Sequence, residues 1–328
     1  MAARKILLFG LGNMGKNHFR VINESPEADI IGIVDPFLKT DSIKGLQIPL
    51  YSKLSEVKDN SFDAAVIASS TETHFDVAKT LLEMGKSLLV EKPLASTYKQ
   101  SLELASLAEQ KKSLLVVGHV ERSNPAVKKV KEVLENGWLG NPIHFSFTRV
   151  GGYPQNVKSG NNVLLDLAVH DMDVLHYLSG EFQVKASICH HSIQNEIPDT
   201  AEILLSSPKG PSASIHVNWI TPTKIRTLRV TGTKGVCFVD YMLQTCTLLG
   251  GNLLQKAPQK NFDYKDLQLH YRNSDKIEFG VAQEEPLKVQ LKEFIKALKG
   301  EMHALCTARE AAEVVRLAED AIKQTGNT

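Results

Sequence analysis

The sequence has little of what marks secreted, membrane-spanning or zinc-binding proteins. Its 328 residues include only four cysteines (Cys189, Cys237, Cys246 and Cys306), which are scattered and form no CxxC pair. Such sparse thiols are typical of a reduced, cytosolic protein rather than of a disulfide framework or a zinc site. No apolar run approaches the roughly eighteen residues that a membrane span requires, so we expect none.

An excess of charge of one sign is also missing. The 38 Lys and Arg residues nearly balance the 37 Asp and Glu residues, which gives a formal net charge of +1. No strong field therefore attracts nucleic acid or a membrane surface, although a small anionic substrate would need only one local basic group. A strand-like run begins almost at the first residue, which leaves no room for a signal peptide. We expect a cytoplasmic protein that is long enough for two domains.

Short apolar runs alternate with helical patterns over residues 1–120. The runs KILLFG, DIIGIVD, AAVIAS, SLLVEK and LLVVGH are rich in Ile, Leu and Val, as buried parallel strands are. The segments HFDVAKTLLEMGK and QSLELASLAEQKK place apolar residues three or four positions apart and end near Gly or Lys, as helices do. This alternation predicts right-handed strand–helix–strand units in a doubly wound parallel sheet.

A different pattern fills residues 121–328. NPAVKKVKEVLENG predicts an amphipathic helix with Asn124 as its N-cap and Pro125 at its first position. Six strand-like runs between residues 143 and 241 predict a mainly antiparallel sheet with one open face. Residues 252–275 are weakly patterned and predict a loop or an irregular edge, and helices return over 284–328. The predicted fold class is α/β: a doubly wound parallel domain over 1–120, then an α+β domain over 121–328.

Three glycines with the spacing GxGxxG stand between the first predicted strand and the first predicted helix: Gly10, Gly12 and Gly15. In this context they allow a tight turn and a close approach of the backbone to a dinucleotide pyrophosphate at the helix N-terminus. Asp35 ends the next strand, 20 residues after Gly15, where an acid binds the adenosine ribose. A carboxylate there would repel a 2′-phosphate, so the pattern favours NAD over NADP. The alternatives are a chance match and a turn role for Asp35 before Pro36.

Two later strands also end in polar residues. The run VIASSTETH places Ser70, Thr71 and His74 at the carboxyl edge of the sheet, where ligands bind in such folds. Thr71 could contact a nicotinamide, and His74 could equally be a helix N-terminal residue without a ligand. Glu91 and Lys92 follow the apolar run SLLV, and Pro93 restricts the lysine to extended geometry. A lysine there could reach a substrate hydroxyl beside a nicotinamide, or be a surface residue in a turn.

A second group of polar residues lies in NNVLLDLAVHDMDVLHYLSG. If this segment is helical, Asp166, His170 and Asp173 fall at i, i+4 and i+7 along one stripe. A carboxylate and an imidazole on one face can hold a hydroxyl and accept its proton. A zinc site is the competing interpretation, but no third ligand group is evident, so we expect no metal. The plain structural interpretation has both acids solvated and the histidine packed.

His119 and Arg122 lie at the predicted domain junction. A guanidinium at this place could bind a phosphate or a carboxylate bidentately. Arg122 could also pair with Glu121 or another acid. The sequence leaves both interpretations open.

The chain resembles the glucose–fructose oxidoreductase, inositol dehydrogenase and MocA family over its whole length. The matching marks, in order, are Gly10-x-Gly12-x-x-Gly15, Asp35, SSTETH, Glu91-Lys92-Pro93 and Asp166-x-x-x-His170-x-x-Asp173. The resemblance implies a Rossmann domain that binds NAD, and an open-faced α+β domain whose sheet supports a homodimer or homotetramer. It also implies Lys92 and His170 as the catalytic pair, with Asp166 orienting a small-molecule substrate. The predicted cofactor contacts are Gly10, Gly12, Asn13, Met14, Gly15, Asp35, Ser70, Thr71, His74, Glu91 and Lys92. The predicted substrate contacts are Lys92, Arg122, Tyr153, Asp166 and His170.

Within this family, GHVERSNPAV and EPLKVQLKEFIKAL resemble the branch that oxidises nucleotide sugars. This resemblance implies oxidation of C3 of UDP-N-acetylglucosamine, often ahead of a sugar aminotransferase. Ser123 replaces a usual aromatic residue and Ala168 a usual glycine, so the substrate pocket and the backbone approach could differ. The alternatives are a dehydrogenase of a free polyol or sugar such as inositol, and a non-catalytic NAD-binding sensor.

Overall fold

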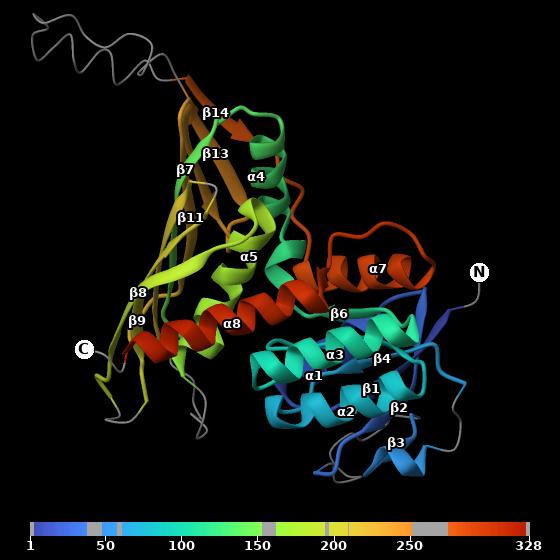
Figure 1. The fold of residues 1–328 in the computed structure, drawn as a ribbon. Coiled ribbons are helices and arrows are strands. Elements are labelled where there is room, and N and C mark those ends of the chain that lie inside the picture. The colour runs from blue at the N-terminus through green and yellow to red at the C-terminus, as the bar shows by residue number, and fades with distance from the viewer. Residues whose placement is uncertain are drawn as a thin grey trace, which may run out of the picture. The chain divides into compact units, whose positions relative to one another are not determined.

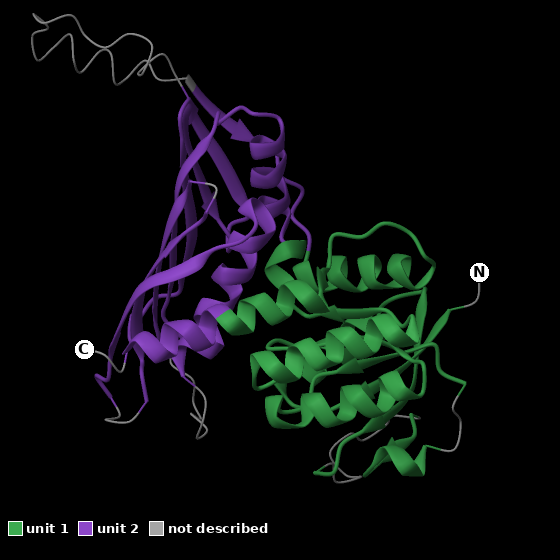
Figure 2. Ribbon diagram, in the orientation of Figure 1, with its two compact units in different colours: residues 1–123, 285–316 green, residues 124–284, 317–328 purple. Residues whose placement is uncertain are grey.

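The chain divides into two compact units, coloured separately in Figure 2. The computed structural model describes residues 3–37, 48–57, 61–152, 162–193, 197–208, 210–250 and 275–325. Unit 1 comprises residues 1–123 and 285–316, and unit 2 comprises residues 124–284 and 317–328. The chain first passes from unit 1 to unit 2 after residue 123, three residues beyond the expected domain boundary at 120. Residues 285–316, which were expected in the second domain, belong to unit 1.

Unit 1 contains a seven-stranded sheet with the order β15-β6-β5-β4-β1-β2-β3 (Figure 1). The first six strands run parallel: β1 (Arg4–Phe9), β2 (Ala28–Val34), β3 (Leu50–Tyr51), β4 (Ala64–Ile67), β5 (Ser87–Val90) and β6 (Leu115–Val117). Strand β15 (Cys306–Thr307) pairs antiparallel with β6. The order 3-2-1-4-5-6 is that of a Rossmann sheet, whose direction of winding reverses between β1 and β4. The predicted doubly wound sheet is confirmed, and it places the ligand crevice at the carboxyl ends of these two strands.

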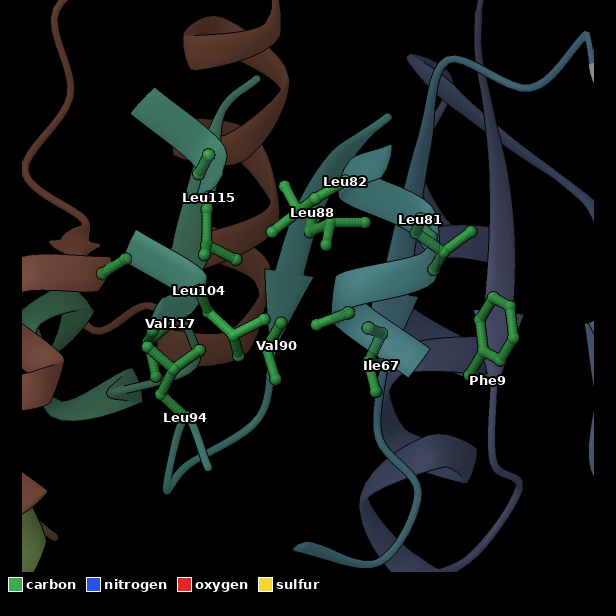
Figure 3. Packing of buried hydrophobic residues seen from close by; sticks show 14 of the residues in the cluster. Phe9, Ile67, Leu81, Leu82, Leu88, Val90, Leu94, Leu104, Leu115 and Val117 are labelled. Carbon is green, nitrogen blue, oxygen red and sulfur yellow. The ribbon is translucent and has the colours of Figure 1, made fainter. Parts of the chain in front are cut away.

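Helices cover both faces of this sheet because every parallel strand is apolar on both sides. Helices α2 (Thr71–Glu83) and α3 (Tyr98–Lys111) bury one set of alternate strand residues, which Figure 3 shows around Leu81, Leu88 and Leu104. Helices α1 (Asn13–Asn23) and α7 (Pro286–Leu298) bury the other set, which includes Ile6 and Leu8. Alternate residues of the central strands therefore belong to two separate hydrophobic clusters, one on each face of the sheet.

Helix α7 completes unit 1 although it lies almost 170 residues after β6 in the chain. Leu287, Leu291, Phe294 and Ile295 pack in the same cluster as the strand residues. Fully burying one such side chain contributes about 1.5–3 kcal/mol. The apolar stripe of this helix therefore explains why residues 285–316 return to the first unit.

Unit 2 contains an eight-stranded sheet with the order β14-β13-β12-β11-β7-β10-β9-β8. All neighbours pair antiparallel except β7 and β10, which are parallel. The strands are β7 (Pro142–Val150), β8 (Gln183–His190), β9 (Thr200–Ser206), β10 (Ser212–Asn218), β11 (Ile225–Gly232), β12 (Gly235–Asp240), β13 (Thr245–Gly250) and β14 (Asp275–Phe279). The predicted open, mainly antiparallel sheet is confirmed. Strands β13 and β14 were not predicted, and residues 252–274 of the weakly patterned segment lie outside the described part.

Two helices pack on one face of the second sheet, as Figure 1 shows. Helix α4 (Pro125–Glu135) begins as predicted: the Ala126 N–H donates to Asn124 Oδ1 at 3.1 Å, and Pro125 occupies the first turn. Helix α5 (Val169–Ser179) follows a five-residue π-helical turn, η4 (Leu164–Ala168). A short 3-10 helix, η3 (Val120–Ser123), ends the first segment of unit 1.

The division between the units falls within the last helix, α8 (Ala308–Thr325). A further 3-10 turn, η2 (Leu54–Glu56), follows β3. Among the helices that the structure describes, none is both long and apolar enough to cross a membrane.

Candidate functional site

The glycine-rich loop lies where the winding of the first sheet reverses. Gly10 has φ +83°, and a Cβ at this position would lie 2.7 Å from the Ala68 carbonyl oxygen and from Ser69 Cα. A Cβ on Gly15 would lie 2.1 Å from the Gly10 carbonyl oxygen. Two of the three predicted glycines are thus required by backbone packing between the ends of β1 and β4 and the start of α1.

The third glycine has a different environment. A Cβ on Gly12 would meet nothing within 4 Å, and the backbone from Gly12 to Met14 is exposed. Helix α1 begins at Asn13, has no side-chain cap and carries no acid in its first turn. Its exposed N–H groups and positive dipole end fit a pyrophosphate, which would lie in the space beside Gly12. The residues present therefore fit NAD.

Asp35 lies beside this loop, directly after β2. Its Oδ2 accepts the Leu11 N–H at 2.8 Å, and its Oδ1 accepts the Phe37 N–H at 2.9 Å. The expected turn role before Pro36 is therefore present, and the same contacts aim the carboxylate at the glycine-rich loop. Each carboxylate oxygen has a second lone pair, so a ribose hydroxyl can also donate to it.

His74 connects two of the predicted cofactor segments. The ring is buried, with Nδ1 2.9 Å from the Pro93 carbonyl oxygen and Nε2 3.2 Å from the Ser69 carbonyl oxygen. Burial lowers the pKa of His74, against the opposing effect of the two carbonyl groups. A neutral imidazole donates from only one nitrogen, and Nδ1 makes the shorter contact. His74 is the fourth residue of α2, so the structural alternative describes its contacts, whereas a contact with the cofactor stays a prediction.

Ser70 and Thr71 form the start of α2. Ser70 is the N-cap residue, and its carbonyl accepts the backbone N–H and the hydroxyl of Thr73. Ser70 is exposed and Thr71 half-buried, at the carboxyl end of β4. Their position in the crevice agrees with the predicted contact with the cofactor, which stays a prediction.

Glu91 is the centre of a buried network that the sequence did not predict. Its Oε1 lies 2.7 Å from His18 Nε2, and its Oε2 accepts the Lys92 N–H at 3.2 Å. A Cβ on Gly118 would lie 2.9 Å from Glu91 Oε1, so only glycine leaves room for the carboxylate. Because His18 belongs to α1, this pair joins the helix of the glycine-rich loop to the lysine segment.

The Glu91 carboxylate is ionised in spite of its burial. Burial alone would raise its pKa, but the hydrogen bond and charge of His18, together with Lys92, lower the pKa of Glu91 below its usual value. A buried charge needs this kind of partner, because an unpaired carboxylate would be strongly destabilising.

Lys92 follows β5 at the carboxyl edge of the sheet and is half-buried. The Lys92–Pro93 peptide bond is cis, which the sequence did not predict. Its backbone is held by Glu91, and the next carbonyl is held by His74. The side chain thus belongs to a fixed segment beside the crevice rather than to a solvated surface turn.

Arg122 is buried and donates from Nη1 to Glu310 Oε1 at 3.0 Å. Partial burial opposes the shift, but the charge of Arg122 and hydrogen bonds from Thr307 lower the pKa of Glu310. The alternative in which Arg122 pairs with an acid is therefore confirmed, and the acid is Glu310 rather than Glu121. The substrate contact predicted for Arg122 stays a prediction. His119 and Ser123 are also buried.

Asp166 lies in the π-helical turn η4. The predicted alignment of Asp166, His170 and Asp173 along one stripe assumed a regular α-helix. The Val169 N–H reaches back five residues to the Leu164 carbonyl, which defines the turn. Asp166 and His170 are half-buried, whereas Asp173 is fully buried. The plain structural interpretation, with solvated acids, is therefore wrong for Asp173. Such turns often occur at functional sites.

Two hydrogen-bond partners of acidic residues in unit 2, one aromatic and one basic, were not predicted from the sequence. Trp219 donates from Nε1 to Asp166 Oδ2 at 3.1 Å. Arg149 on β7 donates to Asp171 from Nε and Nη2 at 2.9–3.0 Å, and both side chains are buried. Asp171 directly follows His170, so this pair fixes the start of α5 on the sheet. Arg149 at an inward position of an alternating strand was the one signal in the sequence that could have revealed the pair.

The predicted residues fall into two groups. The glycines, Asp35, Ser70, Thr71, His74, Glu91 and Lys92 gather in unit 1, whereas Asp166 and His170 belong to unit 2. Tyr153 lies outside the described residues. The joint action of Lys92 and His170 stays a prediction.

Two family models match the chain. Residues 4–119 match the "Oxidoreductase family, NAD-binding Rossmann fold" model, and residues 127–237 match the "GFO/IDH/MocA C-terminal domain" model. Together they cover more than half of the 328 residues. The first match agrees with the geometry of the glycine-rich loop, and the second with the open sheet of unit 2.

Among similar proteins, scyllo-inositol 2-dehydrogenase (NAD(+)) of Bacillus subtilis is 26% identical over 251 residues, which cover 72% of this chain and 73% of that protein. UDP-N-acetylglucosamine 3-dehydrogenase of Acidithiobacillus ferrooxidans is 24% identical over 184 residues, which cover 56% and 57%. A solved structure of an enzyme of that name and organism covers 100% of this chain and 99% of its own, with a TM-score of 0.83 and 18% identity.

A solved levoglucosan dehydrogenase in complex with NADH and levoglucosan covers 99% of this chain and 98% of its own, with a TM-score of 0.83 and 17% identity. At these identities the structural likeness establishes the shared fold. With the two family models and the fitted loop, it leads to one conclusion: the chain belongs to the GFO/IDH/MocA oxidoreductase family and carries its NAD-binding Rossmann domain.

Proposed function

We propose that the chain is an NAD-dependent dehydrogenase that oxidises a secondary alcohol of a sugar, with C3 of UDP-N-acetylglucosamine as the reacting carbon. The observation that carries the proposal is Lys92, which a buried network holds at the carboxyl end of β5 in a family dehydrogenase fold. A relative that is 24% identical over 56% of this chain is named UDP-N-acetylglucosamine 3-dehydrogenase, which supports the nucleotide sugar.

The proposed reaction breaks one C–H bond and one O–H bond of the substrate. The hydride and the proton go to two different acceptors. Bound NAD would supply the acceptor for the hydride of the carbinol carbon. His170 accepts the hydroxyl proton, and Lys92 assists by a hydrogen bond to the same oxygen. Asp166 accepts a hydrogen bond from a neighbouring hydroxyl and so orients the ring. The products are a ketone, NADH and a protonated His170, which returns its proton to solvent.

The substrate's nucleotide needs a separate contact. We assign it to Arg122 and to residues near Tyr153 to Asn162, because Arg122 donates to Glu310 from Nη1 alone in this pair and a guanidinium has further N–H donors. Asn162, the described residue of this segment, accepts the Leu165 N–H at 3.0 Å from the turn that carries Asp166.

The test is turnover of a panel of nucleotide sugars with NAD, with a carbonyl trap present because alcohol oxidation by NAD is uphill near neutral pH. Mass spectrometry should detect trapped ketone from UDP-N-acetylglucosamine together with NADH. Lys92→Met should lower kcat by about 100-fold or more, as loss of acid–base assistance does. Lys99→Met, an exposed lysine of α3, serves as the matched control and should keep full activity.

Turnover that survives Lys92→Met would overturn the assignment of the chemistry. Ketone formed only from free polyols would keep the reaction and change the substrate. NAD binding without turnover on any sugar would favour a sensor instead.

A free polyol such as inositol is the second candidate substrate. The relative with 26% identity over 72% of the chain acts on scyllo-inositol, which favours this candidate. A polyol site has no need to bind a diphosphate. UDP should therefore inhibit competitively if the substrate is a UDP-sugar and have no effect if it is a polyol.

We also propose that two or four copies associate through the open face of the second sheet. Helices α4 and α5 cover the other face, whereas Ile188, Leu204 and Phe238 are 42–53% exposed on this one. Light scattering after size exclusion should give a dimer or tetramer mass, and Phe238→Lys should shift the equilibrium toward monomer. A wild-type monomer at micromolar concentration would contradict this proposal. A sugar aminotransferase stays our expectation for the next step.

A further inference from the structure

Trp219 is the hydrogen-bond donor to Asp166, and nothing in its sequence position assigns it a role. The ring is 2% exposed, and Nε1 lies 3.1 Å from Asp166 Oδ2. An indole N–H can only donate, so a buried tryptophan fixes the direction from which its partner is approached. Donation to a carboxylate is charge-assisted and stronger than a neutral hydrogen bond.

The donor is held rigidly. Trp219 directly follows β10, and its backbone N–H donates to the Asp199 carbonyl at 2.9 Å. Asp199 is itself buried: its Oδ2 accepts the backbone N–H groups of Ser192 and Ile193 at 2.6 and 2.8 Å. The turn after the tryptophan closes where the Thr221 N–H donates to Asn218 Oδ1 at 2.9 Å.

The acceptor is attached to the same segment. The Val163 N–H, at the start of the turn that carries Asp166, donates to the Pro198 carbonyl at 3.1 Å. Pro198 and Asp199 are consecutive residues, so one short stretch of backbone holds both the donor strand and the acceptor turn. The Asp166 N–H donates to the Asn162 carbonyl at 2.9 Å, which fixes the turn from its other side.

We propose that Trp219 is a positioning residue, which holds the Asp166 carboxylate in the orientation that meets the substrate hydroxyl. Rotamer freedom that an aspartate keeps in the free protein has to be lost when the substrate binds. A hydrogen bond from a rigid indole reduces that freedom before binding, as in preorganised sites. The inference rests on the proposed function, because the role of Asp166 does.

The first test is a double-mutant cycle on turnover. Trp219→Phe keeps an aromatic ring and removes the N–H, and should lower kcat/KM about ten-fold while the Kd for NAD stays constant. In an Asp166→Ala background the same change should have no further effect, because the acceptor of the indole N–H is already absent. Equal losses in both backgrounds would make Trp219 a structural residue and overturn the proposal. Trp138→Phe, which alters a 49% exposed ring, is the matched control.

The second test needs no substrate. The chain has only two tryptophans, so ¹⁵N-labelled protein should show two indole cross-peaks, which Trp138→Phe assigns. Asp166→Asn should move the Trp219 peak and leave the Trp138 peak in place. A Trp219 peak that does not move would show that the hydrogen bond is absent and would overturn the proposal, whatever the substrate. A peak that moves in a protein that oxidises no sugar would instead refute the proposed function, and the positioning role with it.

Discussion

Each unit of the molecule places a buried ion pair one residue away from a proposed catalytic side chain, but the cation differs. In unit 1 the pair is His18 with Glu91, directly before Lys92. In unit 2 it is Arg149 with Asp171, directly after His170. Arginine keeps its charge at every physiological pH, so the pair in unit 2 contains a permanent cation. In unit 1 the partner of the buried carboxylate is an imidazole instead.

The largest effect should come from breaking the arginine pair. Arg149→Met leaves the Asp171 carboxylate buried without its guanidinium, which should lower the free energy of unfolding by about 3–5 kcal/mol. Both tryptophans belong to unit 2, so tryptophan fluorescence in urea should report the loss directly.

Arg309→Met provides the control, because it breaks an exposed pair with Glu109 and should cost less than about 1 kcal/mol. Replacing both buried partners, as Arg149→Met with Asp171→Leu, should restore most of the stability. A double variant as unstable as the single one would refute the ion-pair explanation.

The histidine pair should give a smaller and pH-dependent effect. Glu91→Gln should lower stability by about 1–3 kcal/mol at neutral pH, because a buried charge-assisted hydrogen bond is weakened. The pKa of Glu91 is lowered on folding, so its contribution is complete above the usual value of 4.5 and is lost as the pH falls through the folded value. Hydrogen exchange of β1 and β5 should follow this dependence. Glu103→Gln, which breaks an exposed pair with Lys79, is the control and should cost less than about 1 kcal/mol. A stability difference between wild type and Glu91→Gln that stays constant down to pH 3 would contradict the interpretation.

The glycine-rich loop allows unit 1 to be tested without touching its ion pair. Gly12→Ala adds a methyl group where the structure has open space, so the fold should keep its stability. The same methyl group enters the space that we assign to the pyrophosphate, so calorimetry should show NAD affinity about ten-fold weaker, or ~1.4 kcal/mol. Gly15→Ala is the matched contrast, because its Cβ would lie 2.1 Å from the Gly10 carbonyl oxygen and should destabilise the unit. If Gly12→Ala binds NAD as tightly as the wild type, the pyrophosphate does not lie in the space beside Gly12, and our assignment is wrong.

The smallest effect should come from His74. Its pKa is lowered by burial, so below about pH 6.5 the unfolded chain binds a proton that the folded chain does not, and stability falls with the pH. His74→Gln should lose about 0.5–1.5 kcal/mol at pH 8, and this deficit should narrow on acidification. His190→Gln, at an exposed position, is the control and should change stability at pH 8 by less than about 0.5 kcal/mol. A deficit that stays the same between pH 8 and pH 5 would mean that His74 is not the group responsible.

The sequence predicted the elements that depend on neighbours along the chain. The five apolar runs of the first 120 residues became β1, β2, β4, β5 and β6, because strands buried on both faces need continuous apolar residues. The N-cap Asn124 was readable for the same reason, since a cap satisfies the first turn of its own helix. Strands β13 and β14 were missed, because Thr245–Gly250 and Asp275–Phe279 carry only a short and weak alternation.

What the sequence determined by itself is therefore the local chemistry: the glycine spacing, the acid after β2, and the lysine after β5. Only the tertiary structure decided which buried partners hold them. His18 meets Glu91 across 73 residues and Trp219 meets Asp166 across 53, and no periodicity encodes such distances. The π-helical turn that carries Asp166 could not be predicted either. It is defined by a hydrogen bond from the Val169 N–H to the Leu164 carbonyl, five residues earlier, and the spacing of apolar residues does not indicate such a bond. Helix and strand propensities depend on residues that are close in the sequence. The pairing of buried charges instead depends on packing that exists only once the sheets have formed.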